Sequence, residues 1–252
     1  MAITLRKPKE IKALRESNRI VAKTLKYLKE QVKPGVSLLE LDKMGEDMIR
    51  SFGAEPAFKG LYGFSGSVCT SVNEVVIHGI PTDYKLKEGD IVGLDLGANL
   101  NGWFGDGAIT CGVGNISEED SKLIDCSKDA LYYAIKNIKA GMHFKELSLL
   151  LEKFIKGRGY VPLLNFCGHG IGRRPHEEPE IPNYLDCPSA KQGDKIKNGM
   201  VFCIEPMICQ KEGESKVLDD GWSVVSVDGL RTSHYEHTVA IINNRAEILS
   251  VE

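Results

Sequence analysis

The chain has 252 residues, of which 42% are hydrophobic, so it is long enough to bury a sizeable core in one large domain or in two small ones. A formal net charge of −3 gives no basic footprint for specific nucleic-acid binding. No apolar stretch approaches the roughly 18 residues of a membrane span and no signal-peptide core follows Met1, so we expect a cytoplasmic protein without a membrane partner.

Four segments carry the apolar spacing of amphipathic helices. The first spans 8–31 and stops before a Lys-Pro-Gly sequence, which is typical of a helix end. The second opens with a capping box formed by Ser37 and Glu40, and Gly53 ends it. The other two helices are expected at 117–139 and 144–157.

Stretches rich in strand-forming residues lie between these helical pairs, at 68–78, 90–97, 103–111, 201–207, 222–227 and 236–242. Gly89–Asp95 and Gly199–Glu205 share a glycine, an apolar run and a terminal carboxylate at equal spacing, which indicates a duplication. No long Ser/Gly linker divides the chain. We therefore expect a single domain over 1–252, built from two related halves at about 8–112 and 117–250.

Four carboxylates stand where an ionised group is costly. Asp95, Glu205 and Glu236 each adjoin an apolar run that is typical of a buried strand. Asp106 lies between two glycines, and a hairpin that turns at 97–102 would bring it alongside Asp95. Taken alone, Asp106 would more simply cap a turn, and any single acid could form a salt bridge. Four together would need four buried basic partners, which the apolar runs do not offer, so metal binding is favoured.

His169 lies in the glycine-rich run Cys167–Gly172, where the backbone can approach other groups closely. A hydrogen-bonded structural histidine is the ordinary alternative, but the acid cluster favours a metal ligand. Four carboxylates and one imidazole suit two divalent ions. The set is compatible with Co, Mn, Fe(II), Zn or Ni, and the sequence does not choose among them.

Several segments form a set that lies in order and at compatible spacing over nearly the whole length. They are 71–81, 89–97 with Asp106, 168–172, 176–179, 199–202 with 204–206, and 220–222 with 235–238. Together these segments resemble type I methionine aminopeptidases of the pita-bread fold. The resemblance implies an α+β, creatinase/aminopeptidase-like fold, with pseudo-twofold halves and with helices packed outside a curved antiparallel sheet.

The resemblance also implies roles for individual residues. The metal ligands would be Asp95, Asp106, His169, Glu205 and Glu236, with Asp106 and Glu236 bridging two ions. The catalytic residues would be His78, His176 and Glu205, with Glu205 moving a proton and both histidines contacting substrate. A methionine-sized pocket would include Cys69, Phe64 and Trp222. Three positions depart from the familiar pattern, namely Leu61, Pro175 and His234.

A methionine aminopeptidase removes the initiator methionine from nascent proteins, prefers a small second residue, and works by attack of a metal-activated hydroxide on the peptide carbonyl. The resemblance therefore implies nascent polypeptide N-termini as substrates, transient association with the ribosome and a monomeric state.

The sequence leaves two alternative functions to consider. Pita-bread peptidases that cleave before proline have nearly the same ligands, but usually an additional N-terminal domain, whereas the first helix here is expected by about residue 8. A binding module on the same fold would typically have lost ligands, and all five are present. The absence of a large insertion between His176 and Glu205 speaks against type II enzymes.

Overall fold

A computed structural model describes residues 3–185, 187 and 193–251. The helices are α1 (Pro8–Gln31), α2 (Leu38–Ser51), α3 (Glu118–Asn137) and α4 (Phe144–Gly157), with a short 3-10 turn η1 (Leu61–Gly63). The strands are β1 (Glu55–Pro56), β2 (Val68–Val72), β3 (Val75–Ile77), β4 (Ile91–Leu100), β5 (Trp103–Gly112), β6 (Val161–Pro162), β7 (Cys167–Gly170), β8 (Glu177–Pro182), β9 (Val201–Ile204), β10 (Met207–Cys209), β11 (Ser215–Val217), β12 (Val224–Ser226), β13 (Thr232–His234), β14 (Glu236–Ile242) and β15 (Arg245–Ile248).

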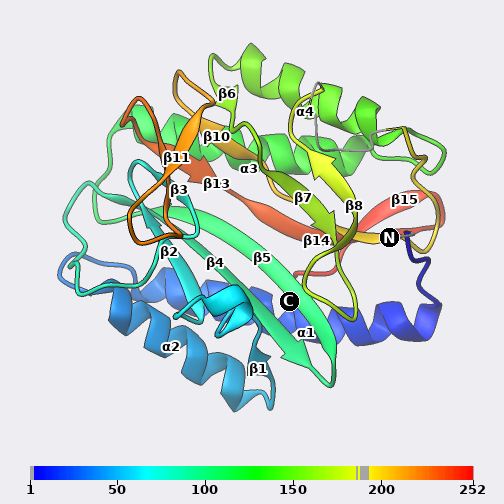
Figure 1. Cartoon of the computed structure of the whole chain (residues 1–252), viewed down its shortest axis with the longest axis horizontal. Helices are drawn as coiled ribbons and strands as arrows, with labels where there is room; N and C mark the ends of the chain where they lie inside the picture. The colour runs from blue at the N-terminus through cyan, green and yellow to red at the C-terminus, as the bar shows by residue number, and fades with distance from the viewer. Residues whose placement is uncertain (1–2, 186, 188–192, 252) are drawn as a thin grey trace.

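A nine-stranded antiparallel sheet forms the centre of the molecule (Figure 1). Its main path is β1-β4-β5-β14-β9-β7-β8, while β2 pairs with β4 and β15 pairs with β14. Helices α1 and α2 lie along the end of the sheet that holds β4 and β5, and α3 and α4 lie along the other end (Figure 1). Two three-stranded sheets, β13-β10-β6 and β11-β12-β3, complete the fold.

The four helices of the described residues begin and end close to the predicted positions, and side-chain caps mark the start of α2 and α3. Ser37 and Glu40 form the predicted capping box, in which the Ser37 hydroxyl accepts from the Glu40 amide (3.2 Å) and the Glu40 carboxylate accepts from the Ser37 amide (2.8 Å). Ser117 caps α3 by accepting from the Asp120 amide at 3.1 Å. These bonds satisfy backbone N–H groups that the first helical turn leaves free.

The hairpin between β4 and β5 has the predicted topology but a later turn. Strand β4 continues through Leu100, so the loop contains only Asn101 (φ 54°) and Gly102 (φ 75°). Two residues with positive φ make the tight turn that fits twisted antiparallel strands. The register places Asp95 opposite Ala108 and Asp106 opposite Gly97, so the two aspartates are diagonal neighbours on one face.

Alternation along the strands separates the core from the site. In β4, Val92, Leu94 and Leu96 join the apolar core under α1 and α2, so Asp95 points to the opposite face. In β9, Phe202 and Ile204 pack against α3 and α4, which directs Cys203 and the following Glu205 away from that core. The acidic positions therefore face away from the helices.

Several short strands lacked a recognisable sequence pattern. In β7, Gly168 and Gly170 lie where there is no room for a side chain. An added Cβ at Gly168 would lie 2.4 Å from the Cys203 carbonyl oxygen, and one at Gly170 would lie 2.1 Å from the Glu178 carbonyl oxygen. The predicted stretch 201–207 is divided into β9 and β10, and the strand predicted at 222–227 is limited to Val224–Ser226. These boundaries depend on tertiary pairing, not on local propensity.

Equivalent contacts recur in the two parts of the chain. The Gly35 amide donates to the Leu86 carbonyl oxygen (2.8 Å), and the Gly141 amide donates to that of Ile196 (2.8 Å). Gly89 and Gly199, the glycines that open the matching heptapeptides, have φ angles of 85° and 88°. Between the two parts, β5 and β14 pair at the middle of the large sheet.

Candidate active site and metal centre

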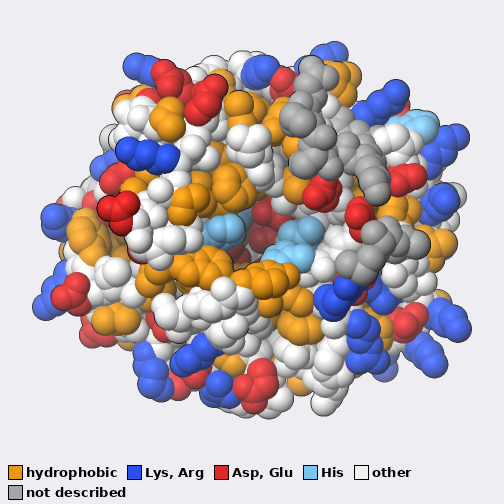
Figure 2. Space-filling view, in the orientation of Figure 1, with side chains coloured by type: hydrophobic (Ala, Val, Ile, Leu, Met, Phe, Trp, Pro, Cys, Tyr) orange, Lys and Arg blue, Asp and Glu red, His pale blue; other side chains and the backbone are white. Residues whose placement is uncertain are grey.

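A cavity of about 480 Å³ opens on the face of the sheet away from the helices. Figure 2 shows the hollow in the middle of this face, with histidine side chains on its walls, acidic side chains at its floor and hydrophobic side chains around it. All five predicted metal ligands and both predicted catalytic histidines line it, together with Cys69, Phe64 and Trp222. The structure thus brings together residues from most of the chain's length in one hollow.

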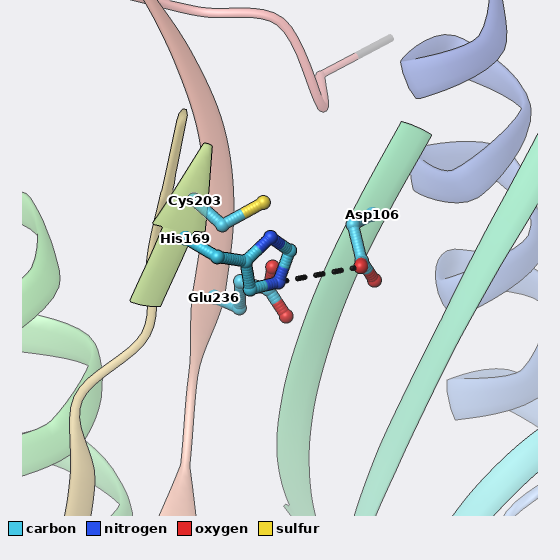
Figure 3. A group of neighbouring side chains, drawn as sticks. All are labelled: Asp106, His169, Cys203 and Glu236. Carbon is cyan, nitrogen blue, oxygen red and sulfur yellow. Dashed lines mark ion pairs between the residues drawn. The ribbon is translucent and has the colours of Figure 1, made fainter. Parts of the chain in front are cut away.

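His169 lies at the centre of the acid cluster. Its Nε2 atom is 3.5 Å from Glu205 Oε1 and 3.8 Å from Asp106 Oδ2. Asp106, His169, Cys203 and Glu236 each offer one ligand atom, and these atoms lie within 4.8 Å of one another. Figure 3 shows the His169 ring pointing towards the Asp106 carboxylate, with the Glu236 carboxylate next to the ring.

Three oxygens of the acid cluster are buried without a hydrogen-bond partner among the described residues: Asp95 Oδ1, Glu205 Oε1 and Glu236 Oε1. A buried polar atom that is left without a partner is strongly unfavourable, and more so when it carries charge. A cation between these oxygens would satisfy them. The donor set therefore fits divalent metal ions, which prefer carboxylate oxygen and imidazole nitrogen.

Electrostatics support the same reading. Burial raises the pKa of Asp95, Asp106, Glu205 and Glu236, and neighbouring acids raise the pKa of the last three further. Burial also lowers the pKa of His169 to about 3, so that its imidazole is neutral and carries a free lone pair. A metal ion would remove the repulsion among the carboxylates and accept that lone pair.

His78 and His176 both line the cavity. The His78 ring packs edge-on against Phe166 (6.0 Å between ring centroids) and Trp222 (6.5 Å). The His176 ring lies 4.5 Å from the His169 ring at 79°. Burial lowers the pKa of His78 to about 4 and also lowers the pKa of His176, so both rings are neutral hydrogen-bonding groups at pH 7.

The apolar wall includes more residues than the sequence indicated. Phe64 and Trp222 make an edge-to-face contact at 5.2 Å beside Cys69. Lining residues that the sequence analysis did not single out are Phe58, Tyr62, Ile77, Phe166, Cys167 and Met207. Strand pairing offered a signal for Cys69, because this residue faces Asp95 across adjacent strands.

The three departures from the familiar pattern occupy different places. Leu61 lines the cavity. His234 is buried next to Glu205, with its Nε2 atom 3.9 Å from Glu205 Oε2. Pro175 is half-buried beside His176 and is not among the described residues that line the cavity.

Comparison with known proteins identifies the family. The model of metallopeptidase family M24 matches residues 12–243. This chain belongs to that family. Its M24 relatives include a methionine aminopeptidase of Helicobacter pylori strain J99, 64% identical over 251 residues with 99% of each chain covered. Methionine aminopeptidase 1 of Bacillus subtilis is 42% identical, in an alignment that covers 98% of this chain and 99% of the Bacillus protein.

Solved structures of M24 enzymes agree with the fold. The methionine aminopeptidase of Thermotoga maritima superposes with a TM-score of 0.95 at 36% identity over all of both chains. The prolidase of Pyrococcus furiosus has a TM-score of 0.80 at 26% identity and covers 98% of this chain but 65% of its own. The predicted α+β pita-bread fold is confirmed. As a member of family M24, this chain is a peptidase that depends on divalent metal. No helix among the described residues is long and apolar enough to span a membrane.

Proposed function

We propose that this chain is a methionine aminopeptidase that removes the initiator methionine from nascent proteins with a small second residue. The observation that carries the proposal is a single cavity in which an apolar aromatic and thiol wall adjoins a cluster of buried acids and histidines. Such a cavity can hold one apolar side chain at a fixed distance from the hydrolytic groups. The relatives that match this chain over its full length are named methionine aminopeptidases.

The proposed metal ligands are Asp95, Asp106, His169, Glu205 and Glu236, which would hold two divalent ions with Asp106 and Glu236 between them. The unpartnered oxygens of Asp95, Glu205 and Glu236 support this assignment. Ions bound there supply Lewis-acid activation of a water molecule and of the scissile carbonyl. The buried acids also favour a free amino group at the same place, which restricts cleavage to the first residue.

Glu205 is the proposed proton carrier. Its carboxyl group lines the cavity, and burial and the neighbouring aspartates raise its pKa, so it can accept a proton from the attacking water and release it to the leaving nitrogen. His176 is proposed to donate a hydrogen bond to the oxygen that gains charge in the tetrahedral state. His78, which also lines the cavity, would hydrogen-bond the peptide group beside the cut.

The proposed methionine pocket consists of Phe64, Cys69 and Trp222, with Leu61 packed against them. An unbranched thioether side chain fits an aromatic wall well, because its sulfur makes favourable contacts with ring edges. Leu61 gives this wall an aliphatic surface. We propose that the pocket therefore accepts methionine without a polar contact to the side chain.

Nascent polypeptide N-termini are the proposed substrates. We also propose a cytoplasmic location, a transient association with the ribosome and a monomeric state. Within one domain over 1–252, the halves 8–112 and 117–250 are proposed to be related, which the recurring glycine turns at Gly89 and Gly199 support.

The test is peptide hydrolysis by protein that has been stripped with a chelator and reloaded with Co, Mn, Fe(II), Zn or Ni separately. We expect release of free methionine from Met-Ala-Ser that depends on the added metal. Cleavage of Ala-Pro-type peptides in place of Met-Ala-Ser would assign the chain to the proline-specific peptidases. Metal binding without hydrolysis of either peptide would indicate a binding module.

A further inference from the structure

His234 is a buried histidine whose side chain has an unsatisfied nitrogen. The residue is 3% exposed, and its Nε2 atom has no hydrogen-bond partner among the described residues. Buried imidazole nitrogens are normally satisfied, and His237 shows the usual pattern: its Nδ1 lies 2.8 Å from Ser250 Oγ and its Nε2 lies 3.1 Å from the Tyr132 hydroxyl. The described residues therefore leave His234 Nε2 available to bind a further group.

The backbone of His234 is fixed from two sides, so the fold sets the position from which its side chain extends. Its amide donates to Thr110 Oγ1 (2.9 Å), and the Thr110 hydroxyl donates to its carbonyl oxygen (2.9 Å). On the other side, β13 pairs with β10 and places His234 opposite Met207. The side chain is held next to the carboxylate of Glu205.

The Glu205 carboxylate lies between two imidazoles. Its Oε1 is 3.5 Å from His169 Nε2, and its Oε2 is 3.9 Å from His234 Nε2. The second distance is too long for a hydrogen bond. It is compatible with two ligands of one ion, because metal–nitrogen and metal–oxygen bonds of about 2.1 Å allow ligand atoms to lie up to roughly 4.2 Å apart.

A second group of possible metal ligands surrounds the Nε2 atom of His234. Glu205, His234 and Glu236 each offer one atom, and these atoms lie within 4.8 Å of one another. Glu236 also belongs to the group that contains Asp106 and His169. The two groups share a carboxylate, so they adjoin one another and could contribute to one metal centre.

We propose that His234 is an additional metal ligand, which gives the centre a second imidazole beside the five ligands of the proposed function, on which this inference rests. Replacing an oxygen or water ligand by imidazole nitrogen favours Co, Fe, Ni and Zn over Mn, which prefers oxygen. His234 thereby shifts the metal preference of this enzyme away from manganese.

The test counts imidazoles on the ion directly, in full-length protein reloaded with Co(II). Each cobalt-bound imidazole whose other nitrogen is protonated gives a strongly shifted, exchangeable N–H resonance in the proton NMR spectrum. We expect two such resonances in the wild type, one in His234→Gln and one in His169→Gln. The wild-type count does not depend on the folding of any variant.

Metal affinity is the second readout. By calorimetry, His234→Gln should bind Co(II) about tenfold or more weakly, while its affinity for Mn(II) changes less. The matched control is His143→Asn, which changes a histidine at the N-cap of α4 and should alter neither affinity nor resonance count.

The outcomes separate this inference from the proposed function. A single wild-type resonance with tight Co(II) binding overturns ligation by His234 and leaves the five-ligand centre intact. A single resonance with weaker binding by His234→Gln would make it a positioning residue that hydrogen-bonds Glu205, which also overturns ligation. Wild-type protein that binds no Co(II) would contradict the metal centre of the proposed function itself.

Discussion

Asp106 and Glu236 illustrate how residue-scale chemistry defines the site. Both are 3% exposed, and they come from β5 and β14, which pair at the middle of the large sheet. Burial and then the charge of Glu236 raise the pKa of Asp106. Two carboxylates so placed are stable in their ionised form only with a cation nearby.

Asp106→Asn keeps the shape of the side chain and removes its charge. We expect this variant to bind metal at least about 100-fold more weakly and to lose nearly all release of methionine, because a carboxylate shared by two ions is lost.

His176→Ala should retain metal and lower kcat by about 10²–10³-fold, the usual effect of losing one oxyanion donor. Calorimetry and Met-Ala-Ser hydrolysis measure the two effects.

The two variants test different parts of the proposal. Turnover by Asp106→Asn at the wild-type rate would contradict a two-ion centre bridged by this residue. Loss of metal from His176→Ala would mean that His176 supports the ligands instead of the substrate.

At the scale of elements, the N-terminal segment fixes the loop that carries His176. Arg6 forms an ion pair with Glu177, and the side chains of the two residues are 7% and 9% exposed. The other Glu177 oxygen accepts from the amides of Arg173 (2.9 Å) and Arg174 (3.2 Å). Arg6 approaches so closely that a Cβ at Gly172 would lie 1.9 Å from its guanidinium. The loop is thus held between the chain terminus and its own backbone.

Arg6→Ala should remove the ion pair with Glu177 and so increase the mobility of the loop that carries His176. Removing one partner of a buried ion pair costs about 3 kcal/mol of unfolding free energy. Displacement of His176 should lower kcat by roughly tenfold with unchanged metal affinity, because small errors in position are costly in catalysis. Chemical denaturation measures the change in unfolding free energy, and steady-state kinetics measures the change in kcat. The control is Arg15→Ala, whose ion pair with Glu247 is partly exposed and should change stability by less than about 1 kcal/mol.

Helix α2 offers a test of stability against pH. Lys59, Arg50 and Ser67 lower the pKa of Glu46 to about 2, from an ordinary value of 4.5. A lowered carboxyl pKa stabilises the fold above pH 4.5, and this contribution is lost as the pH falls through about 2. Glu46→Gln should cost about 1 kcal/mol at pH 7, since the basic partners are partly in water, and the difference should shrink between pH 4.5 and 2. The control is Asp47→Asn, whose ion pair with Lys43 is exposed and should contribute less than about 1 kcal/mol to stability at pH 7.

Elements with strong local signals were predictable, and those set by tertiary contact were not. Helix α1 and the capping box of α2 follow from apolar spacing and side-chain caps that act within a few residues. Strand β7 contains two glycines, Gly168 and Gly170, that are needed because the backbone carbonyls of Cys203 and Glu178 lie against them, which no local pattern reveals. The acid cluster was predictable from charge at strand ends, whereas the burial of His234 beside Glu205 depends on the pairing of β13 with β10.

At the scale of the whole molecule, the proposed metal ligands come from both ends of the sheet. Asp95 and Asp106 come from β4 and β5, while His169, Glu205 and Glu236 come from the β7-β9-β14 side. The two large apolar clusters are separate, one under α1 and α2 and the other under α3 and α4. Beyond the β5-β14 pairing, metal ions would therefore link the strands that carry these clusters.

Removing metal should destabilise the whole chain and not only the cavity, because the repelling carboxylates belong to both ends of the sheet. Metal at about 100 times its Kd stabilises the folded state by about 2.7 kcal/mol. For a chain of this length that corresponds to a rise in Tm of roughly 5–10 °C, which differential scanning calorimetry with and without chelator can measure. Asp106→Asn is the matched control: its Tm should respond little to chelator, and it should equal or exceed that of the metal-free wild type because one buried charge is gone. A wild-type Tm that does not change on chelation would mean that the acids are balanced by protons alone.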